Sequence, residues 1–238
     1  VTISDNGSAG TGTDFLGGIE ALSFADDAAF VNSDTVNLAV LEGGAALSAD
    51  DLEMLTELYV AYFDRAPDAF GLLFWGNALN NGATMNEIAE LFFDQPETQA
   101  KLSVALTPTD FVNTIYNHVL ERDADEAGRD FWVEALNTGG VTQAEFIVAF
   151  LAGARANDSA ADDVRTIEDK ADIGVSYALI NGLNNVDNAA TVLDAYMRSD
   201  PDTSLATAQG LIEGFANAAP GSEATVQLVG LVDDPFMV

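Results

Sequence analysis

Several residue types that carry chemistry are missing or rare in this chain of 238 residues. It has no cysteine, which excludes disulfide bonds and thiolate metal sites. Its one histidine, His118, would have to take part in any Ser–His–Asp arrangement, and it lies in a helical pattern beside Val119 and Leu120. Neither lysine, Lys101 nor Lys170, follows the glycine-rich loop that cradles a phosphate. We therefore expect no enzyme activity.

Positive charge and long apolar runs are also scarce. No apolar stretch reaches membrane-spanning length, and the first residues lack a basic segment followed by an apolar one, as in a signal peptide. Eight Lys and Arg stand against 39 Asp and Glu, a formal charge of −31. Such a surface repels nucleic acid and anionic lipid and attracts cations, so we expect neither nucleic-acid binding nor membrane insertion. The alternative is that the charge serves only solubility.

The clearest pattern that is present is an internal repeat. Residues 58–93 return as residues 115–151, with one inserted glycine, Gly140. A repeat of this length indicates a duplicated supersecondary unit whose copies stack. The matched residues are Tyr59, Arg65, Asp68, Gly71, Phe74, Trp75, Thr84 and Glu87 in the first copy, and Tyr116, Arg122, Asp125, Gly128, Phe131, Trp132, Thr142 and Glu145 in the second.

Each copy has the pattern of three helices. Apolar residues at helical spacing predict a first helix over Leu52–Phe63. Pro67 predicts that this helix ends near Arg65 and that the next one starts there. Glycines end the second helix of each copy, and a Thr-x-x-Glu capping box starts the third.

Charged and aromatic residues recur at the turn between the first two helices. We expect Arg65 with Asp68, and Arg122 with Asp125, to form structural ion pairs that lock the turn. The alternative is a cation site formed by the acidic residues of the two turns, Asp64, Asp68, Asp123 and Asp125. The matched pairs Phe74–Trp75 and Phe131–Trp132 are expected to be core anchors, with a ligand-stacking surface as the alternative.

The runs FDRAPDAFGLLFWGNALNNG and LERDADEAGRDFWVEALNTGG resemble domain-of-unknown-function family 4214. The resemblance covers about residues 50–155, and the second copy departs from it with Asp123-Ala124 in place of Ala66-Pro67. It implies a helical, often repeated domain in large bacterial proteins exported to the cell surface or medium. It brings no catalytic residues with it.

Residues 1–45 have short alternating runs separated by Gly, Asp and Asn, which predict a small β-rich segment. Residues 9–17 fit the nonapeptide of calcium-binding parallel β-rolls, apart from Ala9. Residues 13–26 resemble the strand pair that closes calcium-binding RTX arrays of type I secreted proteins. The resemblance implies calcium contacts at Gly10, Gly12 and Asp14, with Asp26 as a further candidate. The alternative is an ordinary glycine-rich hairpin loop.

Residues 156–238 predict a long helix over residues 156–182 and two amphipathic helices near 187–198 and 203–216. The final residues resemble the terminal signal of type I secretion substrates, an acidic residue followed by apolar ones: Asp234, Phe236, Met237 and Val238. The alternative is that this tail docks on the helical body as a last strand.

The sequence thus predicts a mainly α fold: duplicated three-helix units forming a bundle, a small N-terminal β-rich segment and further C-terminal helices. The expected domains are residues 1–45, residues 46–155 with copies at about 50–96 and 109–155, and residues 156–238.

The expected function is that of a non-catalytic structural or adhesive module of a calcium-binding, type I secreted surface protein. Its partners would be further copies, cell-surface components and the exporter, and its location the cell surface or medium. The alternatives are an accessory region of a secreted hydrolase, a glycan-binding module using Trp75 and Trp132, and a salt-adapted protein that needs no calcium.

Overall fold

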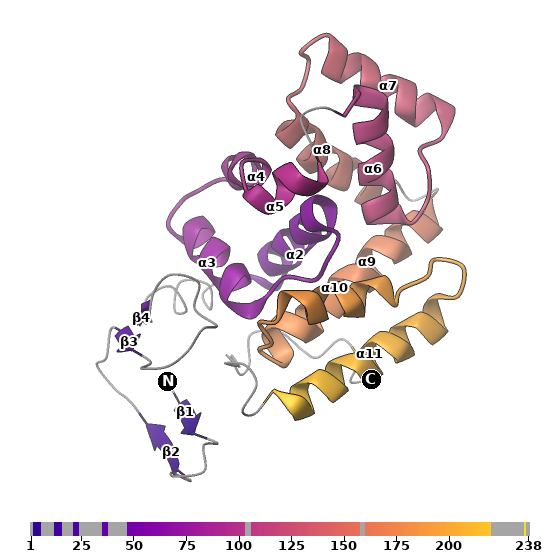
Figure 1. The fold of residues 1–238 in the computed structure, drawn as a ribbon. Coiled ribbons are helices and arrows are strands. Elements are labelled where there is room, and N and C mark those ends of the chain that lie inside the picture. Colours follow the sequence, from indigo (N-terminus) through magenta and orange to yellow (C-terminus); the bar gives the residue numbers. More distant parts are fainter. Residues whose placement is uncertain are drawn as a thin grey trace.

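The computed structural model describes residues 47–102, 106–157 and 160–219, together with Phe236 and the backbone of residues 2–5, 12–15, 21–23 and 35–37. The helices are α2 (Ala49–Phe63), α3 (Ala69–Asn80), α4 (Met85–Phe93), α5 (Pro96–Lys101), α6 (Pro108–Leu120), α7 (Glu126–Asn137), α8 (Gln143–Arg155), α9 (Ala161–Val175), the π-helix η1 (Ser176–Ile180), α10 (Val186–Asp194) and α11 (Pro201–Ala218) (Figure 1).

The two copies, α2–α4 and α6–α8, pack on each other through equivalent helices. Helix α2 contacts α6, and α4 contacts α8 (Figure 1). One buried cluster runs through both copies, with Tyr62 and Phe92 from the first and Phe111 and Phe146 from the second. The apolar faces of the two copies therefore cover each other, as a stacked repeat requires.

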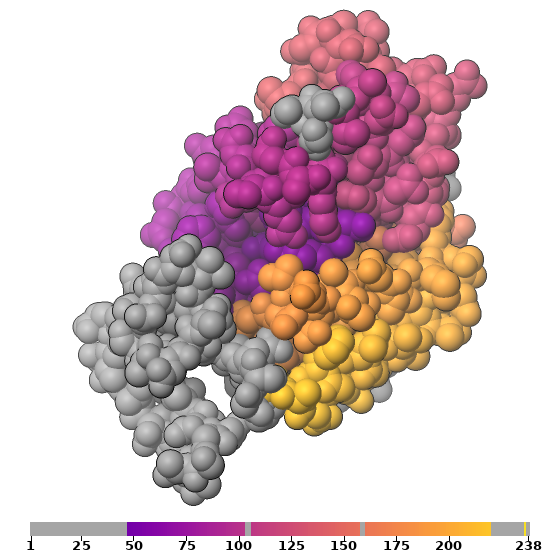
Figure 2. Space-filling view, viewed as in Figure 1, coloured from indigo at the N-terminus to yellow at the C-terminus, as the bar shows by residue number. Residues whose placement is uncertain are grey.

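Helix α9 joins both copies from one side. It packs on α2, α6 and α8, and the loop and helices that follow it form a second cluster around Tyr177 and Tyr196. A Cβ atom at Gly174 would lie 2.3 Å from the Thr56 side chain and 3.0 Å from Pro67, so glycine permits this close approach. Figure 2 shows the first copy, violet to magenta, beside the orange and yellow α10 and α11.

Two helix boundaries differ from expectation. Residues 96–101 lie between the expected copies, and they form the short helix α5, with Pro96 in its first turn. The long helix expected over residues 156–182 begins at Ala161 and changes into the π-helix η1 before Gly182, whose φ of +64° favours glycine.

The predicted fold class needs a correction. From residue 47 onward, the described residues contain helices and loops and no strand. Before residue 47 the structure gives the backbone of four short strands, β1 (Thr2–Asp5), β2 (Gly12–Phe15), β3 (Ala21–Ser23) and β4 (Thr35–Asn37). They form two separate antiparallel pairs, β1–β2 and β3–β4. Because isolated two-stranded pairs are only marginally stable, they do not define a β-rich unit. The fold class is helical, and the β-rich segment was a wrong prediction.

In the part of the chain that the structure describes, no helix is both long and apolar enough to cross a membrane.

Candidate functional site

The repeated residues meet at the junction of the first and second helix of each copy. In the first copy the Arg65 guanidinium lies over the ring of Tyr59, 5.2 Å from its centroid, and 3.5 Å from the Asp68 carboxylate. Asp68 also accepts a 2.7 Å hydrogen bond from the Gly71 N–H and so caps α3. The expected Arg65–Asp68 pair is present, and Asp68 is also the N-cap residue of α3.

Gly71 and Trp75 complete this arrangement from α3. A Cβ atom at residue 71 would lie 2.4 Å from the Tyr59 hydroxyl oxygen, so only glycine leaves room for that hydroxyl. The Trp75 indole donates its N–H to the same hydroxyl, and its ring packs edge-on against Phe92 at 4.9 Å. Burial raises the pKa of Tyr59 well above its ordinary value, which keeps the phenol protonated.

The second copy repeats the same contacts. Arg122 lies 5.3 Å from the ring centroid of Tyr116 and 3.9 Å from Asp125, and Asp125 caps α7 through the Gly128 N–H at 2.9 Å. A Cβ atom at Gly128 would lie 2.5 Å from the Tyr116 hydroxyl, which accepts the Trp132 N–H. The Tyr, Arg, Asp, Gly and Trp of each copy, which we call the turn lock, thus hold two helices together.

The two turn locks differ in the carboxylate that binds the arginine most closely. Arg65 donates two parallel hydrogen bonds to Glu97 of α5, at 2.8 and 3.0 Å. Arg122 donates at 2.9 and 2.6 Å to Asp163 of α9, which also binds Arg198 at 2.6 Å. The two arginines hold the pKa of Asp163 below its usual value despite its burial. These partners could not be predicted from the repeat, because they lie 32 and 41 residues away along the chain.

Both lysines of the chain hold the C-terminal end of the first helix of a copy. Lys101 donates to the carbonyl of Phe63 at the end of α2. Lys170 donates to the carbonyl of His118 at 2.6 Å, and to the Glu121 carboxylate, at the end of α6. A helix C-terminus has unpaired carbonyls and partial negative charge, so an ammonium group there stabilises the fold; of the two lysines, Lys170 is buried and Lys101 is exposed. These residues have structural roles.

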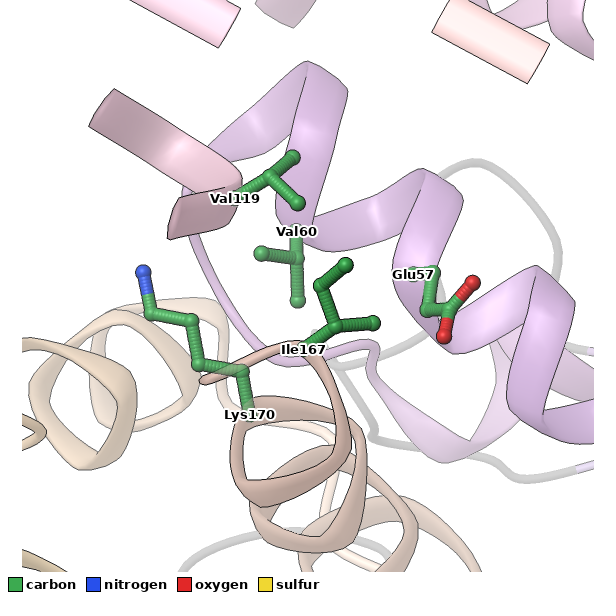
Figure 3. A pocket seen from close by; sticks show the side chains of 5 residues that line it. All are labelled: Glu57, Val60, Val119, Ile167 and Lys170. Carbon is green, nitrogen blue, oxygen red and sulfur yellow. The ribbon is translucent and has the colours of Figure 1, made fainter. Parts of the chain in front are cut away.

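The buried acid Glu57 and the buried Lys170 are separated. Figure 3 shows the side chains of Val60, Val119 and Ile167 between them, and this junction of α2, α6 and α9 has no room for a water molecule. Glu57 pairs with Arg155, and burial raises its pKa to about 7. With no space for a substrate and no contact between the two groups, this junction does not supply acid–base chemistry.

His118 is likewise used within the fold. Its Nδ1 atom lies 2.9 Å from the Ala61 carbonyl oxygen and its Nε2 atom 3.8 Å from the Asp64 carboxylate. Burial lowers its pKa, so the ring is neutral and donates its Nδ1 proton to that carbonyl. It links the two copies at the contact between α2 and α6.

The structure describes the backbone of two of the four predicted calcium residues and does not describe the other two. Gly12 and Asp14 lie in strand β2, opposite Asp5 and Ile3 of β1, while Gly10 and Asp26 lie outside the described residues. Among the described residues, no group of three or more acidic or histidine side chains is placed to hold a metal ion. The alternative of a cation at the two acidic turns therefore gains no support.

The proposed secretion signal also falls largely outside the described residues, which include Phe236 but not Asp234, Met237 or Val238. Phe236 is partly buried and packs against the second core cluster. This contact of Phe236 is what the docking alternative for the tail predicts.

The aromatic pairs are more exposed than expected for core anchors. Phe74 is 53% exposed and Phe131 is 64% exposed, while the two tryptophans are partly buried. The prediction that all four are core residues is wrong for the phenylalanines. Beside Trp75, a groove of about 310 Å³ opens between α2, α3 and α5.

The arrangement defines a class: a helical repeat protein in which polar residues that recur in both copies hold helices together. The family described as Domain of unknown function (DUF4214) matches residues 45–102 and again residues 89–158. Residues 45–158 are therefore similar to that family, and the matches cover the two structural copies. No curated protein and no solved structure matches the chain.

Proposed function

We propose that this chain is a non-catalytic structural or adhesive module of a type I secreted surface protein, joined to further copies or to cell-surface components by calcium. The observation that carries the proposal is the use of the repeated polar residues. Arg65, Asp68, Arg122 and Asp125 cap and join helices, and the buried charges contact one another or backbone carbonyls. The repeat is built to hold a shape.

The charge distribution supports the part played by cations. All eight basic side chains bind the chain's own carboxylates or carbonyls. They do not balance the 39 acidic residues, and the formal net charge is −31. Association of such surfaces requires cations, and divalent ions bridge carboxylates from two molecules. The eight are Arg65, Lys101, Arg122, Arg129, Arg155, Arg165, Lys170 and Arg198.

The export route is supported by the resemblances of residues 9–26 and of the tail to type I secretion substrates. Its test is secretion of the chain by cells that carry a type I exporter, with and without residues 234–238. We expect the shortened chain to stay in the cells. Equal amounts of both chains in the medium would contradict a signal in this tail.

The calcium proposal is tested by assembly. We expect Ca²⁺ to raise the melting temperature and the sedimentation coefficient, whereas K⁺ at the same ionic strength does neither, because monovalent ions screen but do not bridge. Asp14→Asn, at a predicted contact, should weaken the response. Asp130→Asn, at an exposed residue that binds the adjacent Arg129, removes the same charge and serves as the matched control.

Two results would contradict this account. If chelator leaves the melting temperature and the assembly size unchanged, calcium has no role. If K⁺ replaces Ca²⁺ fully, the protein is salt-adapted and the bridging mechanism is wrong.

A further inference from the structure

The groove beside Trp75 has an apolar wall held in a fixed position. Its apolar lining residues are Tyr59 and Phe63 of α2, Trp75 of α3 and Pro96 of α5. The hydrogen bond from the indole N–H to the Tyr59 hydroxyl, with the edge-on contact to Phe92, fixes the orientation of the indole ring. A partly exposed aromatic ring that is already ordered binds a flat apolar face at low entropic cost.

The polar rim of the groove offers acceptors. Each Glu97 oxygen accepts one N–H from Arg65 and keeps a further lone pair, and the Glu97 side chain is 33% exposed. Gln95 donates its side-chain amide to the Leu91 carbonyl at 3.0 Å, which leaves its amide oxygen as an acceptor. The Arg65 side chain is only 6% exposed and is bound to Glu97, Asp68 and the Ala66 carbonyl. A matching ligand therefore brings hydrogen-bond donors.

Charge restricts the chemical class of the ligand further. A net charge of −31 disfavours an anionic ligand. A cation is disfavoured locally, because Arg65 neutralises Glu97 and already lies over the rings of Tyr59 and Phe63, 5.2 Å from each centroid. What remains is a neutral group with an apolar face and several hydroxyl donors, which describes a hexopyranose ring. The groove volume of about 310 Å³ suits one ring, at the small end of ligand sites.

The second copy lacks this rim. The residues that match Gln95, Pro96 and Glu97 there are Gly153, Ala154 and Arg155, within α8. Arg155 points to Glu57, and Arg122 takes its carboxylate from α9 instead. The duplication has kept the turn lock in both copies and the acceptor rim in one.

We infer that the groove of the first copy, between Trp75, Gln95, Pro96 and Glu97, binds a neutral hexopyranose residue of a glycan, and that the second copy does not. The inference goes beyond calcium-bridged assembly, and its test uses calcium-free buffer, so the two proposals fail separately.

The experiment is a fluorescence titration of single-tryptophan variants with methyl hexopyranosides of glucose, mannose and galactose. In Trp132→Phe the emission comes from Trp75, and we expect a saturable change with at least one neutral glycoside. In Trp75→Phe the emission comes from Trp132, and we expect none. Gln95→Ala should weaken binding in the Trp132→Phe background by about threefold or more, because it removes one acceptor. Gln95 makes no side-chain cap for α5, and its hydrogen bond to the Leu91 carbonyl is exposed, so we expect this variant to fold.

Methyl glucuronide and tetramethylammonium serve as charged probes. Binding of either one as tightly as the neutral glycosides overturns the inference, since it would identify an anion site or an aromatic cation site. A response of Trp132 equal to that of Trp75, or no saturable response to any glycoside, overturns it as well. Circular dichroism melts of each variant show that it is folded.

Discussion

The turn lock predicts that Gly128 is required by one atom, the Tyr116 hydroxyl oxygen. A Cβ atom at residue 128 would lie 2.5 Å from that oxygen, whereas its next neighbours, the Asp125 carboxylate oxygens, would be at ordinary contact distances of 3.4 and 3.5 Å. Gly128→Ala therefore forces the hydroxyl to move by about 0.9 Å, which disturbs the hydrogen bond that it accepts from the Trp132 N–H.

The size of this effect follows from overpacking and a strained hydrogen bond. Overpacking of this kind costs about 1–3 kcal/mol. In a Tyr116→Phe background the oxygen is gone, and the same Gly128→Ala change should be neutral or stabilise the protein by up to about 1 kcal/mol, because alanine loses less backbone entropy in a helix. The two changes should thus be coupled by about 2 kcal/mol.

The assay is urea unfolding of the wild type, the two single variants and the double variant, followed by circular dichroism. Gly153→Ala in α8 is the matched control, because a Cβ atom there meets nothing within 4 Å. It should leave the free energy of unfolding unchanged or raise it. If Gly128→Ala costs the same in both backgrounds, the Tyr116 hydroxyl is not what requires glycine, and the reasoning is refuted.

Two further variants test the buried charges. Lys170→Met removes the donor to the His118 carbonyl and to Glu121, and should lower the free energy of unfolding by about 1–3 kcal/mol. Arg129→Met, at an exposed ion pair, should have no measurable effect. Equal losses would contradict the proposal that Lys170 stabilises the C-terminal end of α6. Burial raises the pKa of Glu57 from 4.5 to about 7. Between these pH values Glu57 is protonated in the folded state and ionised in the unfolded state, so its contribution to the free energy of unfolding falls as the pH rises. Melting temperatures across this range should fall less steeply with rising pH for Glu57→Gln than for the wild type, and parallel curves would refute the assignment.

The helices of the two copies and their order could be predicted from local patterns in the amino-acid sequence. The helical spacing of apolar residues and the capping residues are local signals. Thr84 and Thr142 form capping boxes as their spacing predicts, and each starts the third helix of its copy. The repeat also indicated that Arg65 and Arg122 lie beside the N-capping aspartates, because each arginine precedes its aspartate by three residues and the tight turn between them brings the two side chains together. The likeness of residues 45–158 to the family rests on the same local pattern.

The long-range contacts of those residues, in contrast, depend on how the helices pack and could not be predicted from the repeat. Glu97 and Asp163 bind the two arginines most closely, and neither position is marked by the repeat, because α5 and α9 reach the two turns from different parts of the chain. The same difference in surroundings places a groove beside Trp75. Two copies with nearly the same local sequence thus share a fold, while their unlike neighbours give them different surfaces.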